Sequence, residues 1–137
     1  MFKKILVPTD GSTLAAQATT VALGLAKSLN AQIIGVNVID PFPYIGIGDA
    51  SAVGLQAYLS DAKRVAGEAL EGVGSACRAQ NVPFAGDTIE RNLVWEGILE
   101  TAKAEGCDEG QGYLFAKPMP ESEVAVFLAR ASVAAAA

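Results

Sequence analysis

The sequence contains no histidine at all. Without an imidazole, the chain cannot build Ser–His or Cys–His catalytic pairs, the usual zinc sites or a histidine pH switch. Positive charge is also scarce, because 10 Lys and Arg against 15 Asp and Glu give a net charge of −5. A nucleic-acid-binding protein needs a basic face to neutralise phosphates, so we expect no nucleic-acid partner.

Cysteine and long apolar runs are equally sparse. Cys77 and Cys107 show neither CxxC spacing nor the density of a disulfide scaffold, and we expect buried free thiols. No apolar run approaches the roughly 20 residues of a membrane span, so we expect no membrane partner. The early run Ile5–Val7 ends at Pro8, short of a signal-peptide core of about 7–15 residues, which favours a cytoplasmic protein.

What is present is enough apolar sequence for one folded domain. The chain has 137 residues, of which 51% are hydrophobic and 18% charged, and this argues against disorder. We therefore expect residues 1–137 to form a single domain. Strands are predicted at 5–7, 33–39 and 82–90, and helices at about 13–30, 53–80 and 93–105. This alternation of strand and helix predicts right-handed crossovers and a parallel sheet.

Apolar residues spaced by three and four predict which helix faces turn toward the core. In the first helix the predicted core face comprises Leu14, Ala18, Val21, Ala22, Leu25, Ala26 and Leu29. In the third helix it comprises Trp95, Ile98, Leu99 and Ala102. Ser12 or Asp10 is the expected cap at the start of the first helix, and Asn30 closes that helix.

The C-terminal region has a different character. Glu109-Gly110-Gln111-Gly112 precedes a short apolar run, Tyr113 to Ala116, and then Lys117-Pro118-Met119-Pro120. The run predicts a short strand, and the amphipathic stretch 121–133 predicts a last helix. We expect residues 109–137 to form an atypical tail made of these two elements.

With these elements in place, residues 1 to about 108 resemble the universal stress protein family. The resemblance rests on three segments in the family's order: Lys4 to Ser12, Ile34 to Ile39, and Ile98 to Asp108. It implies a three-layer α/β sandwich with a parallel sheet of about four strands in the order 3-2-1-4. Residues 113–116 would then stand in the place of the family's fourth strand.

The resemblance ends near Gly106-Cys107-Asp108. The family's phosphate-binding loop, G-x2-G-x9-G-[ST], and its fifth strand are absent from the sequence. Residues 106–120 instead resemble the end of an EAL-type cyclic-di-GMP phosphodiesterase domain, so the chain has the pattern of a chimera. The Glu-Ala-Leu motif and the metal-binding carboxylates of that domain are missing, and we expect no such catalysis.

The resemblance also implies a binding site for an adenine nucleotide. Pro8, Thr9 and Asp10 would line the pocket, and the backbone of Val38 would contact the base. Simpler readings stay open, since Asp10 can act as a helix cap and Val38 as a core residue. Lys117 could offer a positive charge to phosphates or be an ordinary solvated lysine.

Two groups of residues outside this pocket are interpreted more simply. Asp40, Asp49 and Asp61 are expected to solubilise the surface rather than to bind metal. Tyr44, Ile45 and Ile47 fit a lid, a partner surface or loop side chains folded onto the core.

The function implied is that of a universal-stress-type protein. We expect it to bind ATP, with Mg²⁺, more weakly than a complete family member, to form a homodimer and to signal rather than catalyse. At most it would be a slow ATPase. The alternative is an interaction or scaffold protein of the same fold that binds no nucleotide, because the phosphate loop is absent.

Overall fold

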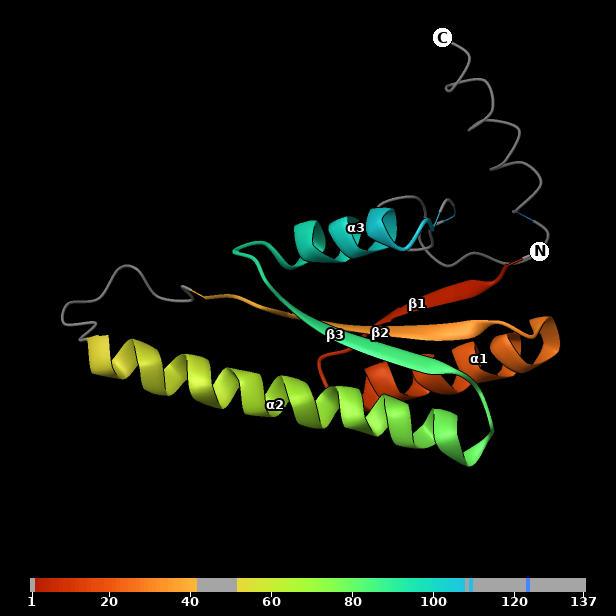
Figure 1. Ribbon diagram of the computed structural model, residues 1–137, viewed down its shortest axis with the longest axis horizontal. Helices are drawn as coiled ribbons and strands as arrows, with labels where there is room; N and C mark the ends of the chain where they lie inside the picture. The colour runs from red at the N-terminus through yellow and green to blue at the C-terminus, as the bar shows by residue number, and fades with distance from the viewer. Residues whose placement is uncertain (1, 42–51, 108, 110–122, 124–137) are drawn as a thin grey trace, which may run out of the picture.

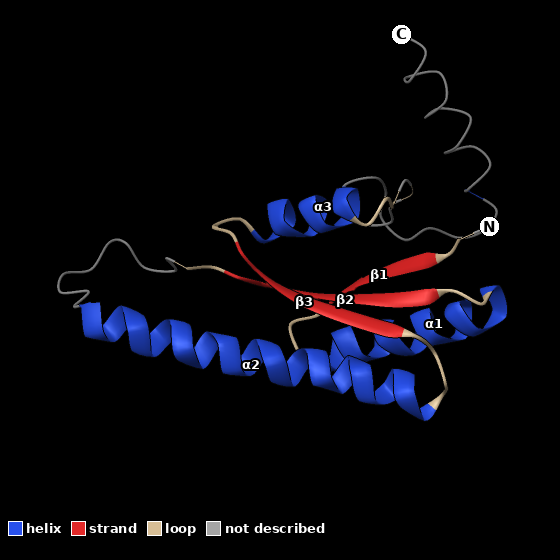
Figure 2. Ribbon diagram, viewed as in Figure 1, coloured by secondary structure: helices blue, strands red, loops and turns tan. Residues whose placement is uncertain are grey.

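A computed structural model describes residues 2–41, 52–107, 109 and 123. Three strands alternate with three helices along this part of the chain (Figures 1 and 2). The strands are β1 (Lys4–Pro8), β2 (Gln32–Ile39) and β3 (Phe84–Glu90). The helices are α1 (Thr13–Leu29), α2 (Ala52–Ala79) and α3 (Val94–Ala104). The predicted strand–helix alternation is therefore confirmed over this part of the chain.

The three described strands form one parallel sheet in the order β1-β2-β3. β2 lies in the centre, with Leu6 opposite Ile34 on one side and Gly35 opposite Gly86 on the other. The predicted parallel sheet is confirmed. The expected strand at 113–116, the helix at 121–133 apart from Glu123, and Lys117 lie outside the described residues.

The helices cover the sheet unequally. α1 and α2 lie side by side on one face, and α3 lies on the opposite face (Figure 1). Strand alternation sends Val7 and Ile33 toward α1 and α2, where they join the main apolar cluster. Ile34 and Val36 point toward the face that carries α3, and both are buried.

The beginning and end of α1 follow from local chemistry. Ser12 is the N-cap, and its hydroxyl oxygen accepts a hydrogen bond from the N–H of Ala15 at 3.2 Å. At the other end Asn30 adopts a left-handed conformation with φ of 52°, which stops the helix. Of the two predicted caps, Ser12 is thus the cap itself, while Asp10 lies in the preceding turn.

The predicted core face of α1 is wrong in part. Ala22 and Ala26 are buried and Leu29 is half-buried, but Ala18 is exposed, and Leu14, Val21 and Leu25 are 75%, 66% and 50% exposed. Thr19 and Leu23 take their places in the core. The helix is rotated so that a narrower stripe faces the three-stranded sheet, and the remaining apolar residues lie outside the contact.

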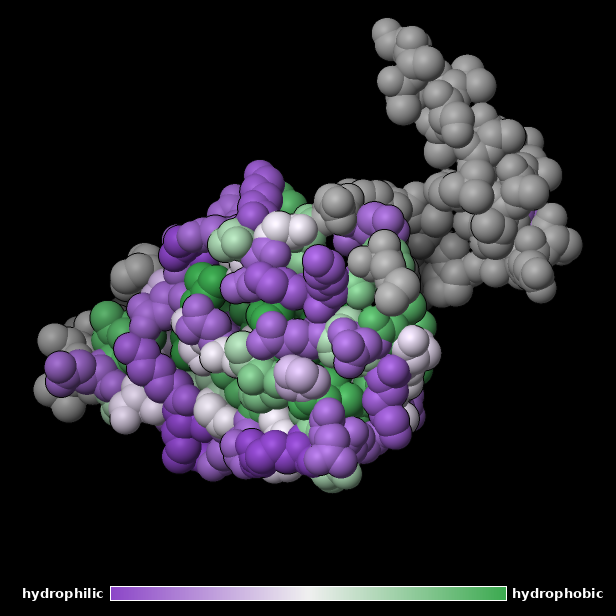
Figure 3. All heavy atoms as spheres, turned by 45° about the vertical axis from the view of Figure 1, so that its right-hand side comes forward, coloured by the Kyte–Doolittle hydropathy of each residue, from purple (hydrophilic) through white to green (hydrophobic). Residues whose placement is uncertain are grey.

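The prediction for α3 fails in the same way. Ile98 and Ala102 are half-buried as expected, whereas Trp95 is 60% and Leu99 45% exposed. The residues that press onto the sheet are Gly97 and Thr101. Apolar surface therefore remains open between polar side chains, as Figure 3 shows for one side of the molecule.

Cys77 is fully buried in the main cluster, and Cys107 is half-buried; both are free thiols. Burial raises the pKa of the Cys77 thiol. We expect a thiol reagent to modify Cys107 in the native protein, and Cys77 only after denaturant is added. Rapid modification of Cys77 in the native Cys107→Ser variant would contradict this placement.

The raised thiol pKa of Cys77 also makes stability depend on pH. The folded state holds the thiol proton more tightly than the unfolded chain does, so this contribution is complete below the ordinary thiol pKa of about 8.5. It is lost as the pH rises through the higher folded pKa.

No helix in the described part of the chain is long and apolar enough to cross a membrane.

Candidate functional site

The turn after β1 gathers the first three predicted site residues. β1 ends at Pro8, and the N–H of Thr9 still donates to the Val36 carbonyl at 2.9 Å. The chain then leaves the sheet, and Asp10 lies exposed at the start of the turn into α1. Pro8, Thr9 and Asp10 therefore lie at the carboxyl ends of parallel strands, where open α/β sheets bind their ligands.

Hydrogen bonds within the turn fix its shape. The N–H of Ser12 donates to the Asp10 carboxylate at 2.9 Å, and the N–H of Gly11 donates to the Thr9 hydroxyl oxygen at 3.2 Å. Gly11 has a φ of 79°, and a Cβ there would lie 3.2 Å from that of Ala69 on α2. The positive φ favours glycine at this position, and a larger residue would also press on Ala69.

Asn37 ties the turn to the neighbouring strand. Its side-chain N–H donates to the carbonyl oxygen of Thr9 at 2.8 Å. Asn37 was not among the predicted site residues, although a polar residue within the apolar run 33–39 was a signal that could have identified it. The bond holds the carboxyl ends of β1 and β2 in a fixed relation.

The side chain and the backbone of Val38 point toward different neighbours, which bears on its two predicted roles as a core residue and as a backbone contact. Its side chain packs against α3, because a Cβ on Gly97 would lie only 2.8 Å from both of its methyl groups. Its backbone is placed differently. Gln32 and Val36 bond to β1, and Ile33 and Ile39 to β3, so the alternation turns the N–H and C=O of Val38 toward the β1 side. They lie beyond Thr9, where β1 has already left the sheet.

The electrostatics of the turn favour an ionised carboxylate. Hydrogen bonds from Ser12, first from its side chain and then from its backbone, lower the pKa of Asp10. The carboxylate also lies next to the N-terminus of α1, whose dipole favours negative charge. Asp10 is therefore ionised at neutral pH and is available at the surface as a hydrogen-bond acceptor.

Residues 1–109 match the universal stress protein family. The chain belongs to this family. The matched segment ends close to residue 108, the predicted limit of the resemblance.

Individual members of the family show both sequence and structural similarity. A universal stress protein of Methanocaldococcus jannaschii is 36% identical over 47 residues, which are 34% of this chain and 28% of that protein. A crystal structure of a family protein from Burkholderia pseudomallei covers 77% of this chain and 76% of its own, with 27% identity and a TM-score of 0.58. A family protein from Arabidopsis thaliana with AMP bound covers 76% and 71%, with 16% identity and a TM-score of 0.57.

The two structural neighbours establish the universal stress protein fold for the described part of the chain. The family match does not extend to the tail, so the resemblance of residues 106–120 to a phosphodiesterase domain stays a prediction. Tyr44, Ile45 and Ile47 also lie outside the described residues.

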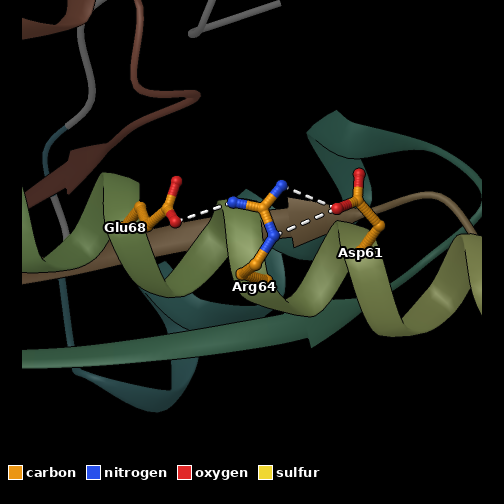
Figure 4. Close-up of polar contacts among 3 residues, drawn as sticks. All are labelled: Asp61, Arg64 and Glu68. Carbon is orange, nitrogen blue, oxygen red and sulfur yellow. Dashed lines mark hydrogen bonds and ion pairs between the residues drawn. The ribbon is translucent and has the colours of Figure 1, made fainter.

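Of the three acidic residues considered for metal binding, Asp40 and Asp61 lie in the described part of the chain, and both have hydrogen-bond or ion-pair partners. Asp49 is outside the described residues, and the backbone carbonyl of Asp40 accepts a hydrogen bond from the Tyr58 hydroxyl at 3.0 Å. Asp61 lies on α2 and pairs with Arg64 at 2.6 Å, and Arg64 also reaches Glu68 at 2.7 Å (Figure 4). Within the described residues there is no cluster of carboxylates, thiols or imidazoles that could hold a metal ion.

Proposed function

We propose that this universal stress protein binds an adenine nucleotide, ATP with Mg²⁺, in the crevice at the carboxyl ends of β1 and β2. The observation that carries the proposal is that Asp10 follows the end of β1 and Val38 lies near the end of β2, so the Asp10 carboxylate and the Val38 backbone lie at the same edge of the sheet. The Asp10 carboxylate supplies an ionised acceptor, and the Val38 backbone supplies a donor and an acceptor for a base. The neighbour from Arabidopsis thaliana, which has AMP bound, supports the choice of ligand.

The proposed role is binding and signalling in stress response, within the cytoplasm and as a homodimer, rather than catalysis. Pro8 and Thr9 complete the wall of the crevice, and Asn37 holds Thr9 in place. The sequence lacks the family's phosphate-binding loop, so fewer backbone N–H groups are available to the phosphates. We therefore propose a weak affinity and at most a slow ATPase activity.

The test is titration calorimetry with Mg²⁺ and ATP, accompanied by thermal unfolding. A dissociation constant near 1 mM corresponds to about −4 kcal/mol, and ten times that concentration stabilises the folded state by about 1.4 kcal/mol. If millimolar ATP produced neither heat nor a thermal shift, the alternative, a scaffold that binds no nucleotide, would replace the proposal.

Replacing Asp10 with alanine is expected to weaken ATP binding by about tenfold, because a hydrogen bond to a charged group is worth roughly 1.5 kcal/mol or more. The matched control is Asp87→Ala. Asp87 is an exposed aspartate on β3 whose carboxylate also accepts a neighbouring backbone N–H, from Thr88 at 2.8 Å. An unchanged affinity in Asp10→Ala would show that the pocket is elsewhere.

A further inference from the structure

α2 runs antiparallel to β2 and β3 and continues beyond the end of β1 (Figure 1). Near the middle of α2, the side chain of Leu70 approaches the sheet so closely that a Cβ on Gly35 would lie 3.1 Å from its Cδ2. Toward the N-terminus of α2, Lys63 pairs with Glu90, the last residue of β3, at 2.8 Å. β1 pairs with β2 only as far as Pro8. The N-terminal half of α2 therefore lies alongside the part of β2 that has no partner in β1.

Tyr58 is the side chain of α2 that reaches the end of β2. Its hydroxyl donates a hydrogen bond to the carbonyl oxygen of Asp40, the residue that directly follows β2, at 3.0 Å. The polar tip is thus held by the backbone, while the side chain as a whole is 39% exposed. A tyrosine placed in this way presents its apolar ring at the surface in a fixed position.

The Asp40 carbonyl lies in the same row as the backbone groups of Val38. The carbonyl of Ile39, between them, accepts the N–H of Arg91 at 3.0 Å and so points toward β3. Because the direction of these groups alternates along a strand, those of Val38 and Asp40 point toward the β1 side. Two residues of a strand span roughly 7 Å. A base that bonds to the Val38 backbone would therefore lie beside the phenol of Tyr58.

We propose that the ring of Tyr58 forms the aromatic wall against which the purine base of the nucleotide packs. The inference rests on the proposed function, since it takes the Val38 backbone as the hydrogen-bonding partner of the base. Aromatic rings attract one another in offset-stacked or edge-to-face arrangements with centroids about 4.5–7 Å apart, which is the scale of the spacing between Val38 and Asp40. Tyr58 is then the residue by which the site distinguishes a nucleotide from free phosphates.

The missing phosphate-binding loop increases the weight of this contact. The sequence offers fewer backbone N–H groups to the phosphates than a complete family member does, so the base supplies a larger share of the binding free energy. Stacking on an aromatic side chain tolerates any base, because every base has a flat π-face. We accordingly expect the ring to favour nucleotides over inorganic triphosphate, rather than one base over another.

A second exposed aromatic side chain lies at the start of α3 but points elsewhere. Trp95 is 60% exposed. Gly97 faces the sheet, because a Cβ there would lie 2.8 Å from both methyl groups of Val38. Trp95 precedes Gly97 by two residues, which places it about 200° around the helix and away from the sheet. Trp95 is therefore the matched control for Tyr58.

The test is NMR of the full chain, titrated with ATP and Mg²⁺ and, separately, with inorganic triphosphate and Mg²⁺. The ring protons of Tyr58 are assigned by their loss in Tyr58→Phe. We expect ATP to shift them together with the Val38 amide, since a stacked base carries a ring current, and triphosphate to leave them unchanged. A Tyr58 ring that stays unshifted while ATP shifts the Val38 amide would overturn the inference, as would an equal shift with triphosphate. If ATP shifted no residue, the inference and the proposed function would fall together.

Substitutions separate the ring of Tyr58 from its hydroxyl. Tyr58→Leu removes both, and we expect it to weaken ATP binding about tenfold, whereas Tyr58→Phe keeps the ring and should stay within about threefold of the parent. Trp95→Leu should bind ATP as the parent does. None of the three substitutions should alter the affinity for triphosphate.

The outcomes of these substitutions distinguish the inference from the proposed function. Full ATP affinity in Tyr58→Leu, beside a loss in Asp10→Ala, would overturn the inference and leave the proposed function standing. Equal losses in the two Tyr58 variants would overturn it in favour of the hydrogen bond to Asp40. If Tyr58→Leu failed to fold, the ring shift in the parent would decide.

Discussion

Replacing Ile33 with alanine is expected to lower the free energy of unfolding by about 3 kcal/mol. Ile33 is fully buried in the central strand β2, and its side chain belongs to the cluster formed with α1 and α2. The truncation removes apolar contact and leaves a cavity that a close-packed sheet fills only partly. Urea unfolding of the parent and the variant, at constant slope, measures the difference.

The control is another β-branched residue, but one that lies on the surface of a helix. Val65 on α2 is 43% exposed, and Val65→Ala should change the free energy of unfolding by no more than about 0.5 kcal/mol. Equal losses from the two substitutions would mean that the burial of Ile33 is not specific to the central strand.

The order of strands and helices could be predicted because each boundary carries a local signal. Ile33 to Ile39 is a largely apolar run, and Ser12 and Asn30 have side chains and conformations that begin and end a helix. Residues 113–116 show the limit of such signals. Their composition predicts a strand, but the edge of the sheet that such a strand would join was inferred from the family resemblance and not from the residues themselves.

The faces of the helices were less predictable, because two adjacent apolar lines run along α1. The line that packs against the sheet includes Thr19, whose hydroxyl donates to the Ala15 carbonyl at 2.9 Å. Thr101 in α3 does the same with the Gly97 carbonyl, also at 2.9 Å. Each threonine satisfies its hydroxyl within its own helix and is buried like an apolar residue, which a hydropathy pattern does not show.

The candidate site likewise combines features that follow from the local sequence with features that depend on how the strands pair. The turn from Pro8 to Ser12 was visible in the sequence, since it contains proline, glycine and a capping residue. The contribution of Asn37 and the orientation of the Val38 backbone depend on which neighbour each residue of β2 bonds to. The neighbouring strand to which each residue of β2 bonds is set by the pairing with β1 and β3, and the sequence of β2 alone does not reveal it.

Gly97 links the stability of the fold to the candidate site. A Cβ at this position would lie 2.8 Å from both methyl groups of Val38, so either α3 or β2 has to move. We expect Gly97→Ala to lower the free energy of unfolding by about 2 kcal/mol, in spite of the better helix propensity of alanine. Because the displaced strand end carries the Val38 backbone, ATP affinity should fall in parallel.

Gly67→Ala on α2 separates packing from propensity, since a Cβ at Gly67 meets nothing within 4 Å. This control should gain up to about 1 kcal/mol and leave ATP affinity unchanged. If Gly97→Ala were as stable as the parent, α3 would not be in close contact with β2. If it were destabilised and yet bound ATP with full affinity, the nucleotide could not depend on the backbone at Val38, and the crevice would have to be assigned to Asp10 and its turn alone.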